Sequence, residues 1–313
     1  MALFDITAHL TDKEALTRKY NLYSNLNSLM NYVSFEYVFE FNSLPVLYRY
    51  KKTDVNTLLD EELIIGDISV ISYDFSRDEG KVLLKGAEQL NLSASHSPIS
   101  RVKYVSSNAI LDPDDDINKA FAEFMDYVNH MLLFYSLDEK GYQGFQNGIG
   151  NIEEGIIQNG KLIDFQNFLA EVSGQKFQLL EKQVNGNPCI YCKFKNEEVS
   201  FFSIASAGTR SLALFYYWYL RMQDASFVFI DEFDAFYHFE LAKNIIVLLR
   251  ELTEQQIVLT THNTDLLSNE LLRPDCYFLI GKKSIVSLPN ATDKDLRKAH
   301  NLQKMYKSGA FHA

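Results

Sequence analysis

The feature that most constrains this chain is an apolar run at residues 227–230 that leads directly into Asp231 and Glu232. A strand covered on both faces of a sheet is apolar throughout, so burial explains the run. Packing gives no reason for two carboxylates at the strand's carboxyl end, which is the edge where open α/β sheets bind ligands. The sequence therefore predicts a buried parallel strand that delivers two acids to a site.

A second apolar, β-branched strand is predicted at residues 256–261, and it ends at His262. The residues between the two strands are predicted to form a helix, because apolar side chains recur at helical spacing: Leu241, Ile245, Leu248, Leu249 and Leu252. A right-handed strand, helix, strand unit makes the two strands neighbours. We therefore expect Glu232 and His262 to project toward one site.

A third element lies upstream, where residues 203–210 are small and rich in hydroxyl groups and an apolar helix follows. The first turn of a helix leaves backbone N–H groups without partners, and these groups bind anions. This segment predicts a helix whose N-terminus faces a phosphate.

The order of these three elements resembles the second half of an ABC-type ATPase head. Such heads occur in the AAA-15/AAA-21 and OLD-like ATPases and, more distantly, in the Rad50 and SMC heads. The resemblance implies that Ser206, Gly208 and Thr209 form the signature motif. In a head-to-head homodimer this motif touches the γ-phosphate of the ATP that the other subunit binds.

The same resemblance assigns the acids and two histidines. It implies that Asp231 acts on Mg²⁺ and that Glu232 orients and polarises the attacking water, since phosphoryl transfer depends on positioning and charge stabilisation. His262 matches the switch histidine that senses the γ-phosphate. His238 stands where the OLD-like branch commonly has a histidine, and the resemblance counts it among the nucleotide-binding residues. The implied ligands are ATP and Mg²⁺.

The fold implied is an α/β, P-loop NTPase-like mixed sheet flanked by helices, with additional antiparallel strands. We expect one domain over residues 1–313. Its parts are a helix with antiparallel strands at 1–109, a helical inserted lobe at 110–175 and the core with the signature, Walker B and switch histidine at 176–313.

A Walker A motif is missing from the sequence, because none of the 14 glycines lies in the pattern Gly-x-x-x-x-Gly-Lys-Ser/Thr. The glycine-rich stretch 144–150 has no lysine after it and is interpreted as a loop. Residues 2–10 are amphipathic helix, which in the resembling family follows the P-loop directly. Our first hypothesis is that Met1 is internal or misassigned and that the first strand and P-loop precede it; the alternative is a pseudo-ATPase. Little or no hydrolysis is expected from the 313 residues alone.

Other segments carry local predictions. The expected elements are helix over most of residues 1–32, antiparallel strands at 33–75, a short strand at 101–105, a helix after the acidic cluster 112–116, strands at 177–202, two short strands at 277–280 and 284–288, and a closing helix. Glu61 and Glu62 are interpreted as a solvated strand start. The Cys189-x-x-Cys192 pair is assigned to a structural strand, because no second pair completes a zinc site.

Composition limits the class of function. The net charge of −11 argues against general nucleic-acid binding, which requires Lys and Arg to neutralise phosphates, although a local basic groove stays open. No signal peptide or membrane-spanning run is visible, so a cytoplasmic protein without a membrane partner is expected.

The resemblance implies a switch in which ATP closes a homodimer, hydrolysis reopens it, and a separate effector protein is gated, as in phage-defence or abortive-infection systems. Two alternatives stay open. One is a non-enzymatic, P-loop-less interaction module. The other is a DNA repair ATPase in the manner of RecF or Rad50, which requires a basic path on one face.

Overall fold

The computed structural model describes residues 2–11, 27, 29–54, 56–94, 99–135, 142–144, 152–282 and 284–312. The expected helix over residues 12–26 and the loop over 145–150 lie outside these ranges. The chain divides into two compact units. The first comprises Met1–Leu133, Tyr142–Gly148 and Ala225–Phe227, and the second comprises Phe134–Gly141, Ile149–Asp224 and Val228–Ala313.

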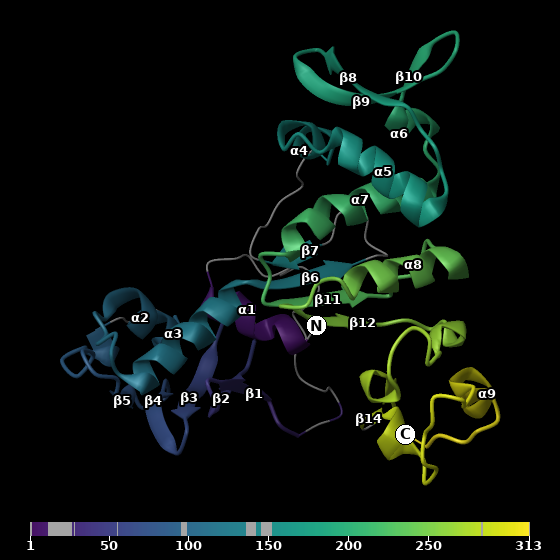
Figure 1. The fold of residues 1–313 in the computed structure, drawn as a ribbon. Coiled ribbons are helices and arrows are strands. Elements are labelled where there is room, and N and C mark those ends of the chain that lie inside the picture. Colours follow the sequence, from purple (N-terminus) through teal and green to yellow (C-terminus); the bar gives the residue numbers. More distant parts are fainter. Residues whose placement is uncertain are drawn as a thin grey trace. The chain divides into compact units, whose positions relative to one another are not determined.

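The first unit contains an antiparallel five-stranded sheet in the order β1-β2-β3-β4-β5 (Figure 1). Its strands are β1 (Val33–Phe41), β2 (Leu44–Lys52), β3 (Leu58–Ile65), β4 (Ile68–Asp74) and β5 (Glu79–Val82). Apolar and polar residues alternate in these strands, so one face is buried and the other is solvated. On the inner face of β1, Phe39 contacts Phe124 edge to face at 5.4 Å between ring centroids. The predicted strands at 33–75 are confirmed.

Among its described residues, the first unit has the helices α1 (Asp5–Leu10), α2 (Arg101–Asn108) and α3 (Asp116–Asn129). The acidic cluster does precede a helix, because the Asp115 carboxylate accepts the N–H groups of Ile117 and Asn118 and caps α3. The predicted strand at 101–105 is wrong. The Ser100 hydroxyl accepts the Lys103 N–H and starts a helix there instead.

Glu61 also differs from the expectation of a solvated strand start. It is 1% exposed, because β3 begins at Leu58 and the pleat turns Glu61 inward beside Leu63. Its carboxylate accepts hydrogen bonds from the Tyr48 hydroxyl at 3.0 Å, the Ser100 hydroxyl at 2.7 Å and the Arg101 N–H. Burial raises the pKa of Glu61.

A four-stranded sheet has the order β12-β11-β6-β7. Its strands are β6 (Met131–Tyr135), β7 (Tyr142–Gly144), β11 (Phe227–Asp231) and β12 (Gln256–Leu259). The prediction that the strands at 227–231 and 256–261 are neighbours, joined by a helix, is confirmed. Sequence reasoning missed β6, which lies within the expected helical lobe, because a short continuous apolar run has no period that separates strand from helix.

The described helices of the second unit are α4 (Ile152–Gln158), α5 (Leu162–Ser173), α6 (Phe201–Ile204), α7 (Ala207–Met222), α8 (Phe239–Leu249) and α9 (Leu302–Lys307). A sheet in the order β10-β9-β8 is formed by β8 (Leu179–Val184), β9 (Asn187–Lys193) and β10 (Glu198–Ser200). The hairpin β13 (Phe278–Ile280) and β14 (Ile285–Ser287) precedes α9 (Figure 1). The strands predicted at 177–202 and in the tail are confirmed, and both Cys189 and Cys192 lie in β9 as free thiols.

Helix packing in the second unit depends on one glycine. A Cβ atom on Gly155 of α4 would overlap with the ring of Tyr217 on α7. Gly155→Ala is therefore expected to lower the free energy of unfolding by about 1–3 kcal/mol, even though alanine is the better helix former. Urea denaturation of Gly155→Ala with Tyr217 intact and with Tyr217→Ala measures this. An equal loss in both backgrounds would show that the ring contact is not the cause.

Within the described ranges, no helix combines the length and apolarity needed to cross a membrane.

Candidate functional site

The two acids lie where β11 ends, within the second unit. Asp231 is the last residue of the strand, and Glu232 follows it with a φ of 45°. A positive φ is uncommon for a residue other than glycine and costs free energy, so the surrounding contacts have to hold it. The turn at Glu232 breaks the alternation of the strand and separates the directions of the two carboxylates.

The end of β12 lies beside these acids. The Thr260 N–H donates to the Ile230 carbonyl at 3.0 Å, and the Thr260 carbonyl accepts the Phe233 N–H at 3.1 Å. Thr260 thus bonds to two different residues of the segment that contains β11. This is the pattern of hydrogen bonds between parallel strands. The neighbouring strand ends deliver their side chains to the same edge.

His262 comes from the loop after β12. Its Nε2 atom lies 3.7 Å from Oε1 of Glu232, and its side chain is 93% exposed, against 37% for Glu232. The expectation that these two residues project toward one site agrees with this distance. An exposed imidazole next to a carboxylate is free to meet a ligand from solution.

The expected signature residues surround the N-terminus of α7. Ser206 caps the helix by accepting the Thr209 N–H at 3.2 Å, and the two hydroxyl oxygens lie 2.8 Å apart. Thr209 is buried and donates its hydroxyl proton to Oε1 of Gln175 at 3.0 Å. Ser206 is exposed, so a ligand can reach its hydroxyl. The buried Thr209 holds the Ser206 hydroxyl in place through their contact.

Gly208 lies close to the loop that follows the acids. A Cβ atom at this position would lie 3.2 Å from the carbonyl oxygen of Phe236, which is tighter than ordinary contact. The Tyr237 hydroxyl also donates to the Ser211 carbonyl of α7 at 3.3 Å. The start of α7 and the segment after the acids therefore form one packed surface.

His238 has a role in the fold itself. It is the N-cap of α8, and its Nδ1 atom accepts the Leu241 N–H at 3.4 Å. An accepting Nδ1 places the ring proton of the neutral imidazole on Nε2. The geometry gives His238 a helix-capping role. Within the part of the chain that the structure describes, no hydrogen bond or ion pair joins His238 to Glu232 or His262.

Sequence reasoning missed two threonines at this site. The Thr260 hydroxyl contacts both acids, since it donates to Oδ1 of Asp231 and accepts the Glu232 N–H, each at 2.7 Å. The Thr261 hydroxyl donates to Oδ1 of Asp234 at 2.6 Å. The Thr-Thr pair directly before His262 was the only sign of these contacts in the sequence. Which carboxylate each hydroxyl contacts depends on the register between the two neighbouring strands, and this register is known only from the structure.

The donor set suits Mg²⁺. This ion usually takes one or two carboxylates from the protein and completes its shell with water and phosphate oxygens. One oxygen of Asp231 is oriented by the Thr260 hydroxyl, and the side chain is only partly buried, so the other oxygen can meet an ion. The acid end of the site can therefore contribute a carboxylate to Mg²⁺, whereas the sequence offers no P-loop pattern for a phosphate cradle.

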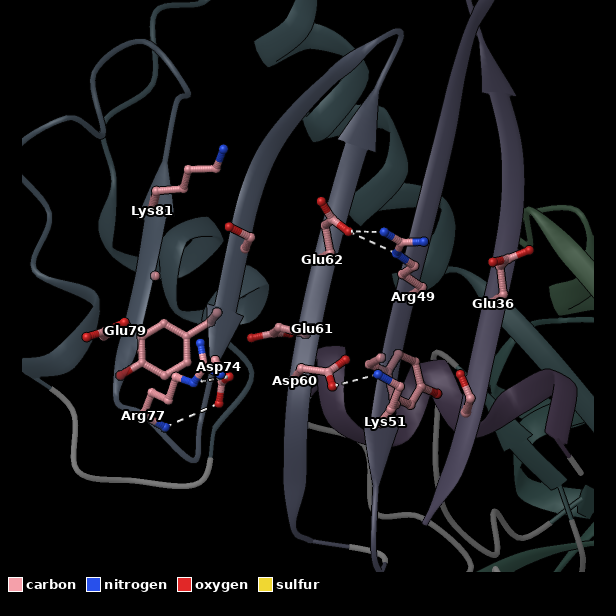
Figure 2. A pocket seen from close by; sticks show the side chains of 15 residues that line it. Glu36, Arg49, Lys51, Asp60, Glu61, Glu62, Asp74, Arg77, Glu79 and Lys81 are labelled. Carbon is pink, nitrogen blue, oxygen red and sulfur yellow. Dashed lines mark hydrogen bonds and ion pairs between the residues drawn. The ribbon is translucent and has the colours of Figure 1, made fainter. Parts of the chain in front are cut away.

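A separate hollow of about 800 Å³ lies on the solvated face of the five-stranded sheet (Figure 2). Its charged residues pair across the strands: Arg49 with Glu62 at 2.6 Å and Lys51 with Asp60 at 3.0 Å. Acidic residues outnumber basic ones among the labelled side chains. This face does not supply the basic path that a DNA-binding ATPase requires.

Solved structures similar to this chain include SMC heads. The SMC head domain from Thermotoga maritima aligns at 14% identity over 75% of this chain and 65% of that chain, with a TM-score of 0.35. The SMC head bound to the C-winged helix domain of ScpA aligns at 13% identity over 74% and 67%, with a TM-score of 0.39. The alignment thus spans just under two thirds of the Thermotoga chain.

No curated protein matches the sequence. A family profile described as "AAA domain, putative AbiEii toxin, Type IV TA system" matches residues 22–268. That range includes all the predicted site residues, from Ser206 to His262. The chain belongs to this AAA-21 family of P-loop ATPases.

Proposed function

We propose that this protein is a nucleotide-driven switch that binds ATP with Mg²⁺ and hydrolyses it. The observation that carries the proposal is the meeting of Asp231, Glu232 and His262 at the ends of two neighbouring strands, with 3.7 Å between the Glu232 carboxylate and the imidazole. A carboxylate and an imidazole at this spacing face one position, where the carboxylate can orient a water molecule and the imidazole can donate to a terminal phosphate.

Each residue has a distinct task in this proposal. Asp231 would hold Mg²⁺, which neutralises charge on the phosphates. Glu232 orients the attacking water and accepts its proton, and His262 donates a hydrogen bond to the γ-phosphate. Ser206 and Gly208 present the start of α7 to the γ-phosphate held by a second copy of the chain, with Thr209 bracing Ser206.

The proposed switch is a homodimer that ATP closes and hydrolysis opens. Residues 1–313 would act as one ATPase domain, in which 176–313 carry the site. The family description names a toxin of a type IV toxin–antitoxin system, which supports a role in abortive infection, with a separate effector protein gated by the dimer in the cytoplasm. A non-enzymatic interaction module is the second candidate, favoured by the missing Walker A pattern.

Glu232→Gln tests the proposal. The amide keeps the size and one acceptor of the carboxylate but cannot take a proton, so hydrolysis should fall by about 10²–10⁴-fold while the ATP-bound dimer persists. Turnover and sedimentation are measured with Mg·ATP, in whichever form binds it: the 313 residues alone or with further residues of their own reading frame.

Glu240→Gln is the matched control, because Glu240 is an exposed acid in the first turn of α8 and outside the site. It should leave turnover unchanged. Undiminished hydrolysis in Glu232→Gln would remove Glu232 from its assigned task. No binding of Mg·ATP by any form would favour the interaction module.

A further inference from the structure

Thr260 forms hydrogen bonds with four consecutive residues at the end of β11, Ile230 to Phe233. Its backbone bonds to Ile230 and Phe233, and its hydroxyl bonds to the two acids between them. Its backbone N–H and carbonyl extend the ladder beyond the strand ends, whereas its hydroxyl makes contacts that no ladder requires. The hydroxyl of Thr260 therefore has a role beyond the pairing of the two strands.

The hydroxyl stabilises an uncommon backbone conformation. Glu232 has a φ of 45°, and its N–H, turned by this conformation, ends on Oγ1 of Thr260 at 2.7 Å. Without that acceptor, a part-buried N–H would lose its partner, which is costly. An extended Glu232 would continue the strand's alternation, and its carboxylate would then leave the neighbourhood of His262.

The same hydroxyl orients the other acid. A hydroxyl has one proton to donate, and here it goes to Oδ1 of Asp231 at 2.7 Å, while a lone pair accepts the Glu232 N–H. Both functions of the group are used, so its rotation is fixed. Threonine is restricted at χ1 by its branched Cβ, which keeps the hydroxyl in place.

We infer that Thr260 is the positioning residue of the catalytic site: its hydroxyl sets the directions of the Asp231 and Glu232 carboxylates toward metal and water. This inference rests on the proposed function of the two acids. Thr260 touches neither nucleotide nor water in this role and acts only through its neighbours. Serine can replace its hydrogen bonds, whereas valine, with the same shape, cannot.

Thr261 provides a matched control in the next position. Its hydroxyl also donates to a carboxylate, that of Asp234, and accepts the Asn263 N–H at 2.9 Å. Thr261→Val therefore removes an equivalent hydroxyl from the same strand end without touching Asp231 or Glu232. It separates the general loss of a hydroxyl from the loss of the one that holds the acids.

The first test needs no nucleotide. Amide hydrogen exchange at Glu232 is measured by NMR on the chain itself, in Thr260→Val, Thr260→Ser and Thr261→Val. Thr260→Val should speed exchange of the Glu232 N–H by about tenfold or more, because its acceptor is gone. Thr260→Ser should stay close to wild type, and Thr261→Val should leave Glu232 unchanged. If Thr260→Val proves unfolded by circular dichroism, Thr260→Ala carries the same test.

The second test uses the form that hydrolyses ATP. Thr260→Val should lower kcat by about 10–100-fold and change KM for ATP by less than about threefold, because orientation rather than binding is lost. Thr260→Ser should restore kcat, as a purely structural role would not require.

Two results would overturn the inference: exchange at Glu232 that Thr260→Val leaves unchanged, or a kcat that Thr260→Val leaves intact. Failure of the proposed function looks different. In that case Glu232→Gln itself leaves turnover intact, or no form hydrolyses ATP, and the exchange result alone then decides whether Thr260 holds the Glu232 backbone.

Discussion

Lys52→Met is expected to lower the free energy of unfolding by about 3–5 kcal/mol. Nζ of Lys52 lies 2.6 Å from Oδ2 of Asp5, and the side chains are 1% and 3% exposed. The Tyr50 hydroxyl donates to the same Asp5 oxygen at 2.7 Å. Methionine fills much of the lysine's volume but leaves the Asp5 carboxylate buried without its cation, and an uncompensated buried charge is strongly destabilising.

Lys51→Met is the control for this prediction. Lys51 is the preceding residue of β2 and also pairs with an aspartate, Asp60, at 3.0 Å, but these side chains are 41% and 42% exposed. Water already solvates both charges, so the loss should stay below about 1 kcal/mol. Urea denaturation of both variants compares the two pairs directly. Equal losses would show that burial of the Lys52–Asp5 pair has no energetic consequence.

Acid should destabilise the protein through His9. Burial lowers the pKa of His9 to about 3, and its Nε2 atom lies 2.8 Å from the Tyr48 hydroxyl oxygen. In the unfolded chain the pKa of histidine is about 6.5, so between these values the unfolded state binds the additional proton. The stability that neutral His9 supplies is therefore complete above about pH 6.5 and falls by up to about 1.4 kcal/mol per pH unit toward pH 3.

His9→Gln isolates this effect, because glutamine keeps a polar side chain that does not titrate. The free energy of unfolding is measured from pH 7 to pH 4 for both proteins, and the wild type should lose stability relative to the variant as the pH falls. A difference that does not change with pH would contradict the assignment. Conformational destabilisation by the substitution itself appears as a constant offset and leaves the slope intact.

Glu61 acts in the opposite direction and can be separated in the same series. Because burial raises its pKa, the stability that it contributes is complete below its unfolded pKa and is lost as the pH rises through the folded value. Glu61→Gln removes this dependence. Because Glu61 and His9 both contact the Tyr48 hydroxyl, the His9 comparison repeated in a Glu61→Gln background measures how strongly the two groups are coupled.

Local periodicity predicted much of the fold. The alternation at 33–75, the helical spacing before Asn129 and the small cap at Ser206 all depend on neighbours within a few residues, and these elements form as expected. Helix α2 was mistaken for a strand because its start depends on one capping bond from Lys103 to Ser100. Strand β6 was missed because its first four residues are all buried, and a short run without exposed residues has no period.

The candidate site also has one part that could be predicted from the sequence and one part that could not. Sequence order alone placed Glu232 and His262 at the ends of two neighbouring strands, because a strand, helix, strand unit has only one common handedness. The role of Thr260 could not be predicted, since it depends on the register that brings residue 260 beside residues 230–233. His238, selected by resemblance, is a helix cap in the structure.

The sequence by itself determined the family, the order of the chemical elements and the secondary structure that repeats with a clear period. Only the tertiary structure decided that Glu61 and Lys52 are buried and that one hydroxyl contacts both acids. The physical reason is the separation along the chain of the residues that each feature depends on. A period is encoded in adjacent side chains, whereas the burial of a charge and the partner of a hydroxyl depend on residues far along the chain, whose positions are set when strands pair and helices cover one face of a sheet.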